Sequence, residues 1–92
     1  MTSEKLNVVA KIRVMPTDVN IKLNEINSKI AEIVSEFGKV HETKTKPIAF
    51  GLNALELTIL LNDSKGGIDR IEAGIKKLNG VGGVEVIDLN RI

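Results

Sequence analysis

The chain of 92 residues contains no cysteine, no tryptophan and no tyrosine. Without cysteine it can form no disulfide, no reactive thiolate and no cysteine-ligated zinc site. The absence of disulfides fits a reducing compartment. The N-terminus lacks the pattern of a secretory signal peptide, and no apolar run reaches the length of a transmembrane helix. We therefore expect a soluble cytoplasmic protein that makes no membrane contact.

Neither sign of charge dominates, because 13 lysines and arginines face 12 aspartates and glutamates. This balance argues against a protein that binds nucleic acid through a strong basic field. The only histidine, His41, lies in a polar segment without converging partners, so we interpret it as a solvated surface residue. No pair of nucleophile and base can be assembled either. We expect no enzymatic activity, no metal site and no cofactor.

Two segments show the period of two that is typical of strands buried on one face. The apolar face of the first consists of Leu6, Val8, Ala10, Ile12 and Val14, and that of the second consists of Leu55, Leu57, Ile59 and Leu61. Pro16 ends the first strand, and the Pro16-Thr17-Asp18 segment supplies turn and helix-start residues. Because these two strands are the most apolar, we predict that they lie at the centre of a sheet.

Two other segments carry apolar residues three and four apart, which predicts amphipathic helices. The first stripe is Leu23, Ile26, Ile30, Ile33, Val34 and Phe37, and the second is Ile68, Ile71, Ile75 and Leu78. Gly38 is predicted to stop the first helix in a left-handed conformation, which makes Phe37 a core residue at the helix end. The Asn79-Gly80 pair is predicted to stop the second helix.

The remaining strands are less regular. Residues 39–46 alternate in a polar way and predict an edge strand, whose lysines and following Pro47 oppose unwanted pairing. A last strand is predicted over residues 84–90, with the Gly82-Gly83 pair before it. Strict alternation would place Val84 and Val86 on one face of this strand. Ile87 and Leu89 would then lie on the other face.

The predicted element order is strand, helix, strand, strand, helix, strand. This is the β-α-β-β-α-β order of a ferredoxin-like sandwich, an α+β fold. Right-handed crossovers then give a four-stranded antiparallel sheet of order 4-1-3-2 with both helices on one face. We expect residues 1–92 to form a single domain, since a chain of this length has room for one core.

The loop after the edge strand carries an unusual residue. Phe50 is one of only two aromatic residues, and it lies between Pro47 and Gly51, where the chain must turn. A large apolar side chain on a loop needs either a core or a partner to cover it. The residues alone leave both interpretations open: Phe50 covers the end of the core, or it anchors another macromolecule.

Two other functional classes fit this fold. RNA-binding domains of this shape stack bases on aromatic residues of the central strands, but these strands carry Lys11, Arg13, Glu56 and Thr58 instead. The glycine-rich segment 64–67 before the second predicted helix could hold an anion, although it lacks the full phosphate-loop spacing. A small regulatory module that binds a metabolite or an anion is therefore the alternative to a protein-binding domain.

The Pro47-Ile48-Ala49-Phe50-Gly51-Leu52 segment, followed by Leu55-Glu56-Leu57, resembles the signature of the elongation factor 1-beta family. The resemblance also covers residues 11–16, the glycine pair 66–67 and residues 87–92. The six-element fold is shared by many families, whereas the Pro-Ile-Ala-Phe-Gly motif is fairly specific. The chain corresponds in length to the exchange domain alone, which is the form that archaea have.

The resemblance implies a guanine-nucleotide exchange domain. Such a factor promotes GDP-for-GTP exchange on translation elongation factor 1-alpha, so that this GTPase can again bind aminoacyl-tRNA in protein synthesis. The implied partner is the GDP-bound GTPase, without direct contact to nucleic acid or membrane. The family's mechanism docks the loop that bears Phe50 against the GTPase domain and sends the penultimate basic side chain, here Arg91, toward the magnesium and phosphates.

The partner-binding residues implied in this way are Pro47, Ile48, Phe50, Gly51, Arg91 and Ile92. The eukaryotic members carry lysine at the penultimate position, whereas arginine is larger, planar and forked.

Overall fold

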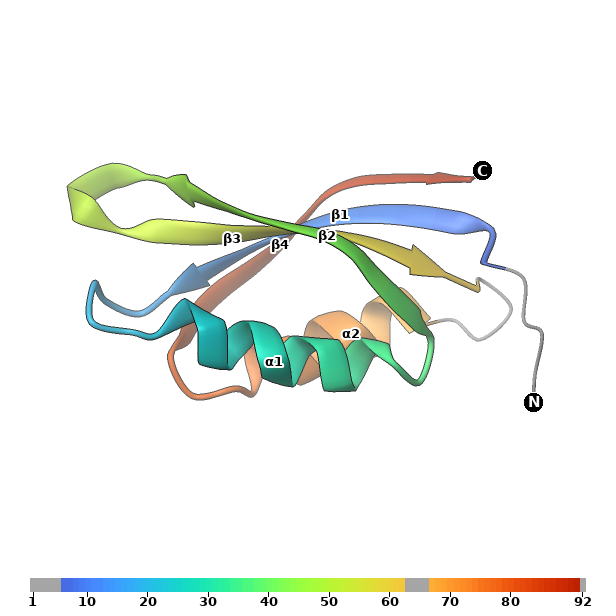
Figure 1. Ribbon diagram of the computed structural model, residues 1–92, viewed down its shortest axis with the longest axis horizontal. Helices are drawn as coiled ribbons and strands as arrows, with labels where there is room; N and C mark the ends of the chain where they lie inside the picture. Colours follow the sequence, from blue (N-terminus) through green and yellow to red (C-terminus); the bar gives the residue numbers. More distant parts are fainter. Residues whose placement is uncertain (1–5, 63–66, 92) are drawn as a thin grey trace.

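The computed structural model describes residues 6–62 and 67–91 (Figure 1). The elements are β1 (Val8–Pro16), α1 (Leu23–Val34), β2 (Gly38–Pro47), the 3₁₀ turn η1 (Ala49–Gly51), β3 (Asn53–Leu61), α2 (Gly67–Lys76) and β4 (Val81–Arg91). The predicted order of strands and helices is confirmed.

The four strands form one antiparallel sheet of order β2-β3-β1-β4, which is the predicted order 4-1-3-2 seen from the other edge. Both helices cover the same face of the sheet, and the other face is open (Figure 1). The predicted ferredoxin-like α+β fold is therefore confirmed, with β1 and β3 at the centre and β2 and β4 at the edges.

The core lies between the sheet and the two helices. Its buried strand residues are Val8, Ala10, Ile12, Val14, Ala54, Leu55, Leu57, Ile59 and Leu61, and its buried helix residues are Ile26, Ile30, Val34, Ile71 and Ile75. The predicted apolar faces of both central strands and both helices are thus confirmed, except that β1 begins at Val8 and not at Leu6. Burial of each valine, leucine or isoleucine among them contributes about 1.5–3 kcal/mol relative to exposure.

Gly38 does not have the predicted role. Helix α1 ends at Val34, and Gly38 is the first residue of β2, without a positive φ angle. A Cβ atom at this position would overlap the carbonyl oxygen of Leu60, so glycine is required by the close approach of two strands. Phe37 lies in the turn beyond the helix, where its ring packs on Gly67 and against the core. Gly80 has a positive φ angle of 91°, but α2 already ends at Lys76, so Gly80 belongs to the turn that leads into β4 and does not stop the helix as predicted.

Strand β4 differs most from its prediction. It begins at Val81, so Gly82 and Gly83 lie within the strand and not before it. Its pairing with β1 shifts register twice, which leaves Gly82 and Ile87 without an opposite residue. Such an extra residue is a β-bulge.

The bulge at Ile87 changes the side of the sheet on which the following residues lie. Val84 is opposite Val14 and Leu89 is opposite Ala10, and both partners point into the core. The prediction that Val84 and Leu89 lie on different faces is therefore wrong, because the bulge interrupts the alternation between them.

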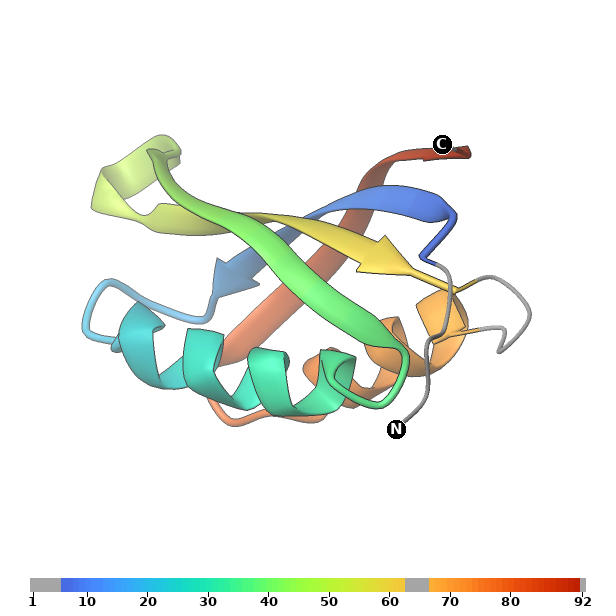
Figure 2. The ribbon, with the colours of Figure 1, turned by 45° about the vertical axis from the view of Figure 1, so that its right-hand side comes forward.

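The molecule is elongated, with extents of 42 × 21 × 18 Å. The turn that joins β2 and β3 lies at one end of the long axis, and the end of β4 lies at the other (Figures 1 and 2). In the described part of the chain, neither helix is long and apolar enough to cross a membrane.

Candidate partner-binding surfaces

Phe50 lies at the outer end of the β2–β3 ribbon, in the 3₁₀ turn η1. It is 94% exposed, more than any other large apolar residue that the structure describes. This exposure excludes the interpretation in which Phe50 covers the core. The turn between β2 and β3, which carries Phe50, projects beyond the helices (Figure 1).

The backbone of this turn is unusual. Phe50 has φ 60° and ψ 32°, in the left-handed region, and the next residue, Gly51, has φ 77°. A residue other than glycine in this region costs of order 1–3 kcal/mol. Two hydrogen bonds close the turn: the Ile48 N–H donates to the Leu52 carbonyl at 2.8 Å, and the Leu52 N–H donates to the Ala49 carbonyl at 3.1 Å.

The structure brings four of the predicted site residues together in this turn. Pro47 is the last residue of β2 and pairs with Asn53, and it is exposed. Ile48 is half-buried, whereas Phe50 and Gly51 are exposed. The Pro47–Gly51 part of the sequence motif thus forms one continuous patch on the surface of the β2–β3 turn.

Val19 extends this surface, and sequence analysis did not find it. It lies in the loop between β1 and α1 and is 60% exposed. A Cβ atom on Gly51 would lie 3.8 Å from Val19 Cγ1, so the two loops lie next to each other. The Asp18 carboxylate accepts a hydrogen bond of 2.6 Å from the Asn20 N–H, so Asp18 belongs to the turn around Val19 and not to the start of α1. We call Val19, Ile48 and Phe50 the apolar tip.

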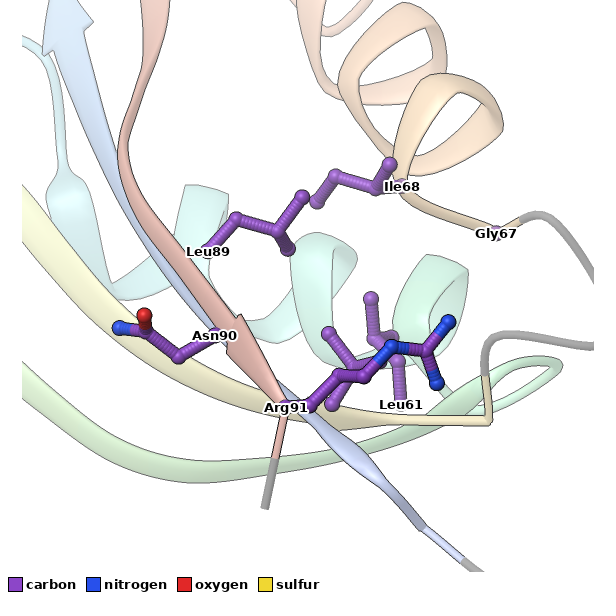
Figure 3. A pocket seen from close by; sticks show the side chains of 7 residues that line it. Leu61, Gly67, Ile68, Leu89, Asn90 and Arg91 are labelled. Carbon is purple, nitrogen blue, oxygen red and sulfur yellow. The ribbon is translucent and has the colours of Figure 1, made fainter.

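Arg91 lies at the opposite end of the molecule, as the last residue of β4. It is exposed and pairs with Val8 of β1. Beside it is a cleft of about 290 Å³ lined by Val8, Leu61, Gly67, Ile68, Leu89, Asn90 and Arg91. The Leu89 side chain points toward Ile68 of α2, and the Asn90 side chain points away from it (Figure 3). Ile92, also a predicted site residue, lies outside the described residues.

The structure does not bring Phe50 and Arg91 together. Strand β3 begins next to the apolar tip and ends at Leu61, beside Arg91, so the two predicted contacts are separated by a full strand length (Figures 1 and 2). They cannot form one cleft. A partner that contacts both has to reach along the long axis of the domain.

The open face of the sheet carries paired charges. The Glu56 carboxylate contacts Arg13 Nη2 at 3.1 Å and Lys46 Nζ at 3.6 Å, and Arg13 Nη1 lies 3.4 Å from Glu85. The hydrogen bond from Arg13 lowers the pKa of Glu56, and the nearby Lys46 ammonium acts in the same direction. With Phe37 against the core and Phe50 at the tip, the open face has no aromatic residue on which bases could stack.

The remaining candidate residues show no converging chemistry. His41 is exposed and lies at the register shift of β2. Among the residues that the structure describes, no three His, Cys, Asp or Glu side chains are grouped so that they could hold a metal ion. In the candidate anion loop, Gly67 is buried against the Phe37 ring, and residues 64–66 lie outside the described residues.

The comparisons with known proteins decide between the functional classes. The family model of the EF-1 guanine nucleotide exchange domain matches residues 9–92. The chain belongs to this family. The exchange domain is 39% identical over 87 residues to elongation factor 1-beta of Methanosarcina barkeri, covering 94% of this chain and 98% of that protein. It is 42% identical over 83 residues to the protein of the same name from Archaeoglobus fulgidus, covering 90% and 94% of the two chains.

Solved structures agree with the fold of the exchange domain. The ACT domain from GTP pyrophosphokinase of Chlorobium tepidum superposes with a TM-score of 0.62 at 21% identity, covering 88% of this chain and 99% of that one. The C-terminal domain of the MgtC protein from Mycobacterium tuberculosis gives a TM-score of 0.68 at 16% identity, covering 100% and 94%. At such low identities these likenesses concern the fold alone.

Proposed function

We propose that this guanine-nucleotide exchange domain acts on the GDP-bound form of translation elongation factor 1-alpha and contacts it at both ends of the long axis. The observation that carries the proposal is Phe50, an almost fully exposed ring in an unfavourable backbone conformation, within the motif typical of the family. Neither feature stabilises the isolated domain. Both are expected of a side chain that is kept ready for a partner.

The apolar tip is the anchor in this proposal. Aromatic residues that enter a pocket on a partner commonly supply a large share of the binding energy. Phe50 is fixed by the closed turn, so little conformational freedom of its backbone is lost on binding. Val19, which lies near Gly51, and Ile48, two residues before Phe50, add apolar surface around this anchor that would help to exclude water from the contact. The tip therefore binds the GTPase but does not itself touch the nucleotide.

Arg91 acts on the nucleotide site. In this class of GTPase a magnesium ion bridges the phosphates and the protein, and it requires near-ideal octahedral oxygen geometry. A guanidinium placed in that region competes with the ion electrostatically, so GDP loses affinity and leaves. The coupling is reciprocal: the factor weakens GDP binding, and bound GDP weakens the binding of the factor by the same amount of free energy. No covalent bond is made or broken.

The test is the rate of GDP release. Elongation factor 1-alpha loaded with a fluorescent GDP analogue is mixed with excess GTP, and the fluorescence decay is followed with and without the exchange domain. We expect a many-fold acceleration that is reduced by Phe50→Ala and by Arg91→Ala. Glu32→Ala, on the exposed surface of α1, is the matched control. An active GTPase whose release rate does not change in the presence of the folded domain would refute the proposal.

The coupling between GDP and the exchange domain is tested separately. The dissociation constant of the complex is measured with the GTPase in its nucleotide-free state and across a series of GDP concentrations. Reciprocal coupling predicts that the apparent affinity for the exchange domain falls as GDP rises, by the same factor by which the domain weakens GDP. If the affinity of the GTPase for the exchange domain does not depend on the GDP concentration, the domain binds without weakening GDP binding, and the proposed coupling is wrong.

A further inference from the structure

We propose that a chain of ion pairs, Lys46–Glu56–Arg13, fixes the direction of the β2–β3 ribbon and so positions Phe50 for the GTPase. This inference rests on the proposed role of Phe50 as an anchor. Lys46 is then a positioning residue, because it acts through Phe50 and not through a contact of its own with the GTPase.

The sheet divides near the base of the turn that carries Phe50. Strand β1 pairs with β3 as far as Val14, which is opposite Leu55, and then continues beside β4 up to Pro16. The β2–β3 ribbon runs on from this point without β1 as a neighbour (Figure 1). The turn and the two paired rows before it therefore belong to a ribbon of two strands. Two strands alone form only a marginally stable unit in water.

Apolar packing does not fix the end of this ribbon. Leu55 and Ala54 are buried, but no residue from 45 to 53 is. Val19 lies next to Gly51 but is itself 60% exposed, so it gives the turn little packing support. The hydrogen bonds within the turn fix its own shape and not its direction relative to the sheet. A segment with so few buried contacts moves easily unless another interaction restrains it.

The ion pairs cross the open face of the sheet one residue before it divides. Glu56 is directly opposite Arg13, and its carboxylate oxygen Oε2 lies 3.1 Å from Arg13 Nη2. The other oxygen, Oε1, lies 3.6 Å from the Nζ atom of Lys46, which belongs to the part of the ribbon beyond β1. Arg13 in turn lies 3.4 Å from Glu85 of β4. The chain of opposite charges thus joins Lys46 to the other three strands.

The carboxylate at the centre of this chain is its most protected member. The Glu56 side chain is 19% exposed, compared with 57% for that of Lys46. The hydrogen bond from Arg13 and the Lys46 ammonium hold the pKa of Glu56 below its usual value, so the carboxylate is charged at neutral pH. Several charges that share one partner in a network restrain it better than an isolated surface pair does.

The first experiment measures the direction of the turn in the isolated domain. Residual dipolar couplings of the Ala49, Phe50 and Gly51 N–H bonds are compared with those of β1 and β3. In the unchanged domain all should fit one alignment, because the turn is held against the sheet. Lys46→Met keeps most of the aliphatic stem but removes the charge, and it should lower the couplings of the turn alone. Lys46→Arg, which keeps the charge, should preserve them.

Lys44→Met is the matched control. Lys44 lies two residues before Lys46 on the same strand, and its Nζ atom lies 3.7 Å from Glu42 of that strand. Its removal takes away the same charge but no ion pair between strands. The couplings of the turn should therefore stay unchanged in this variant.

The second experiment determines whether Lys46 acts through Phe50. The affinity for nucleotide-free elongation factor 1-alpha is measured for Lys46→Met, Phe50→Ala and the double variant. Lys46→Met should lower the affinity by about two- to fivefold, the range expected of a partly exposed ion pair. In the Phe50→Ala background the same substitution should have a smaller effect, because no ring is left to position. Lys44→Met should leave the affinity unchanged.

The outcomes distinguish this inference from the proposed function. Unchanged couplings in Lys46→Met would show that the ion pairs do not fix the ribbon. Lowered couplings with unchanged affinity would show that the direction of the ribbon does not matter for docking. An equal loss of affinity with and without Phe50, or equal losses for Lys44→Met and Lys46→Met, would mean that Lys46 acts on the GTPase by its own charge.

Each of these three results overturns the inference, and the proposed function stays intact as long as the unchanged domain accelerates GDP release. If the unchanged domain does not accelerate GDP release, the proposed function fails and this inference falls with it. The dipolar couplings then still report whether the ion pairs hold the ribbon, because they need no GTPase.

Discussion

Phe50 combines two features that cost free energy at the level of a single residue. Its backbone is left-handed, and its ring gains no burial within the domain. By contrast, Phe37, the other aromatic residue, packs on Gly67 and against the core. The same residue type thus stabilises the fold at one position and is exposed to solvent at the other, and substitutions should separate these roles.

We predict that Phe50→Ala weakens binding to elongation factor 1-alpha by about 2 kcal/mol or more, as expected of an aromatic anchor. Its effect on the free energy of unfolding should be within about 0.5 kcal/mol, since an exposed side chain loses few contacts. Phe50→Gly should also bind poorly without loss of stability, because glycine adopts a positive φ readily. Titration calorimetry and urea unfolding measure the two quantities. A strongly destabilised variant with unchanged exchange would contradict the assignment.

Val19 is expected to make a smaller contribution to the same contact. Val19→Ser removes apolar surface from the apolar tip but leaves the turn hydrogen bond between Asp18 and Asn20 in place. Affinity should fall by less than for Phe50→Ala, and stability should change by no more than about 0.5 kcal/mol. The matched control is Val9→Ser, a half-buried valine on the open face, which should leave affinity unchanged. If the Val19 variant and the unchanged domain bind with equal affinity, Val19 does not contribute to the contact with the GTPase.

Among the elements, the two central strands and the two helices could be predicted from the sequence because their apolar residues follow one period without interruption. Strand β4 could not, since two bulges break its alternation and nothing in the residue types marks Ile87 as the extra one. The direction of Phe50 depends on the geometry of the turn from Ile48 to Leu52, and the proximity of Val19 to Gly51 joins loops that are distant in sequence. Local patterns carry neither kind of information.

The central strands also carry an ion-pair network with a defined dependence on pH. Because Arg13 and Lys46 hold the pKa of Glu56 below its usual value, the folded domain binds this proton less readily than the unfolded chain does. The stabilisation is present above the unfolded pKa, about 4.3 for a glutamate, and is lost as the pH falls through the lower folded pKa.

We therefore predict that Glu56→Gln is less stable than the unchanged domain at pH 7 and that the difference shrinks as the pH falls through the lowered pKa of Glu56. Urea unfolding at a series of pH values measures it. Glu32→Gln on the surface of α1 controls for the general effect of removing one negative charge. A difference that persists at pH 2 would mean that Glu56 stabilises the sheet by packing and not by its charge.

At the scale of the whole molecule, the two proposed contacts lie at opposite ends of a 42 Å body. Substitutions that are far apart and share no contacting residue have additive effects on free energy. We predict that the losses of exchange caused by Phe50→Ala and Arg91→Ala, expressed as free energies, add to within about 0.5 kcal/mol in the double variant. Phe50 and Val19, which share one end, should deviate from additivity. For each pair, the GDP release rates with the unchanged domain, the two single variants and the double variant give the coupling energy. A strong coupling between Phe50 and Arg91 would show that the two ends do not act as separate contacts.

The paired strands β2 and β3 set the distance between these ends, and this length cannot vary continuously. Lengthening both strands by two residues moves the turn outward by about 7 Å and keeps every side chain on its face. Lengthening both strands by one residue moves the turn half as far, but Phe50 would then face the opposite side of the sheet. Related domains that serve a larger or smaller GTPase should therefore differ in this ribbon by even numbers of residues per strand, or else carry a compensating bulge.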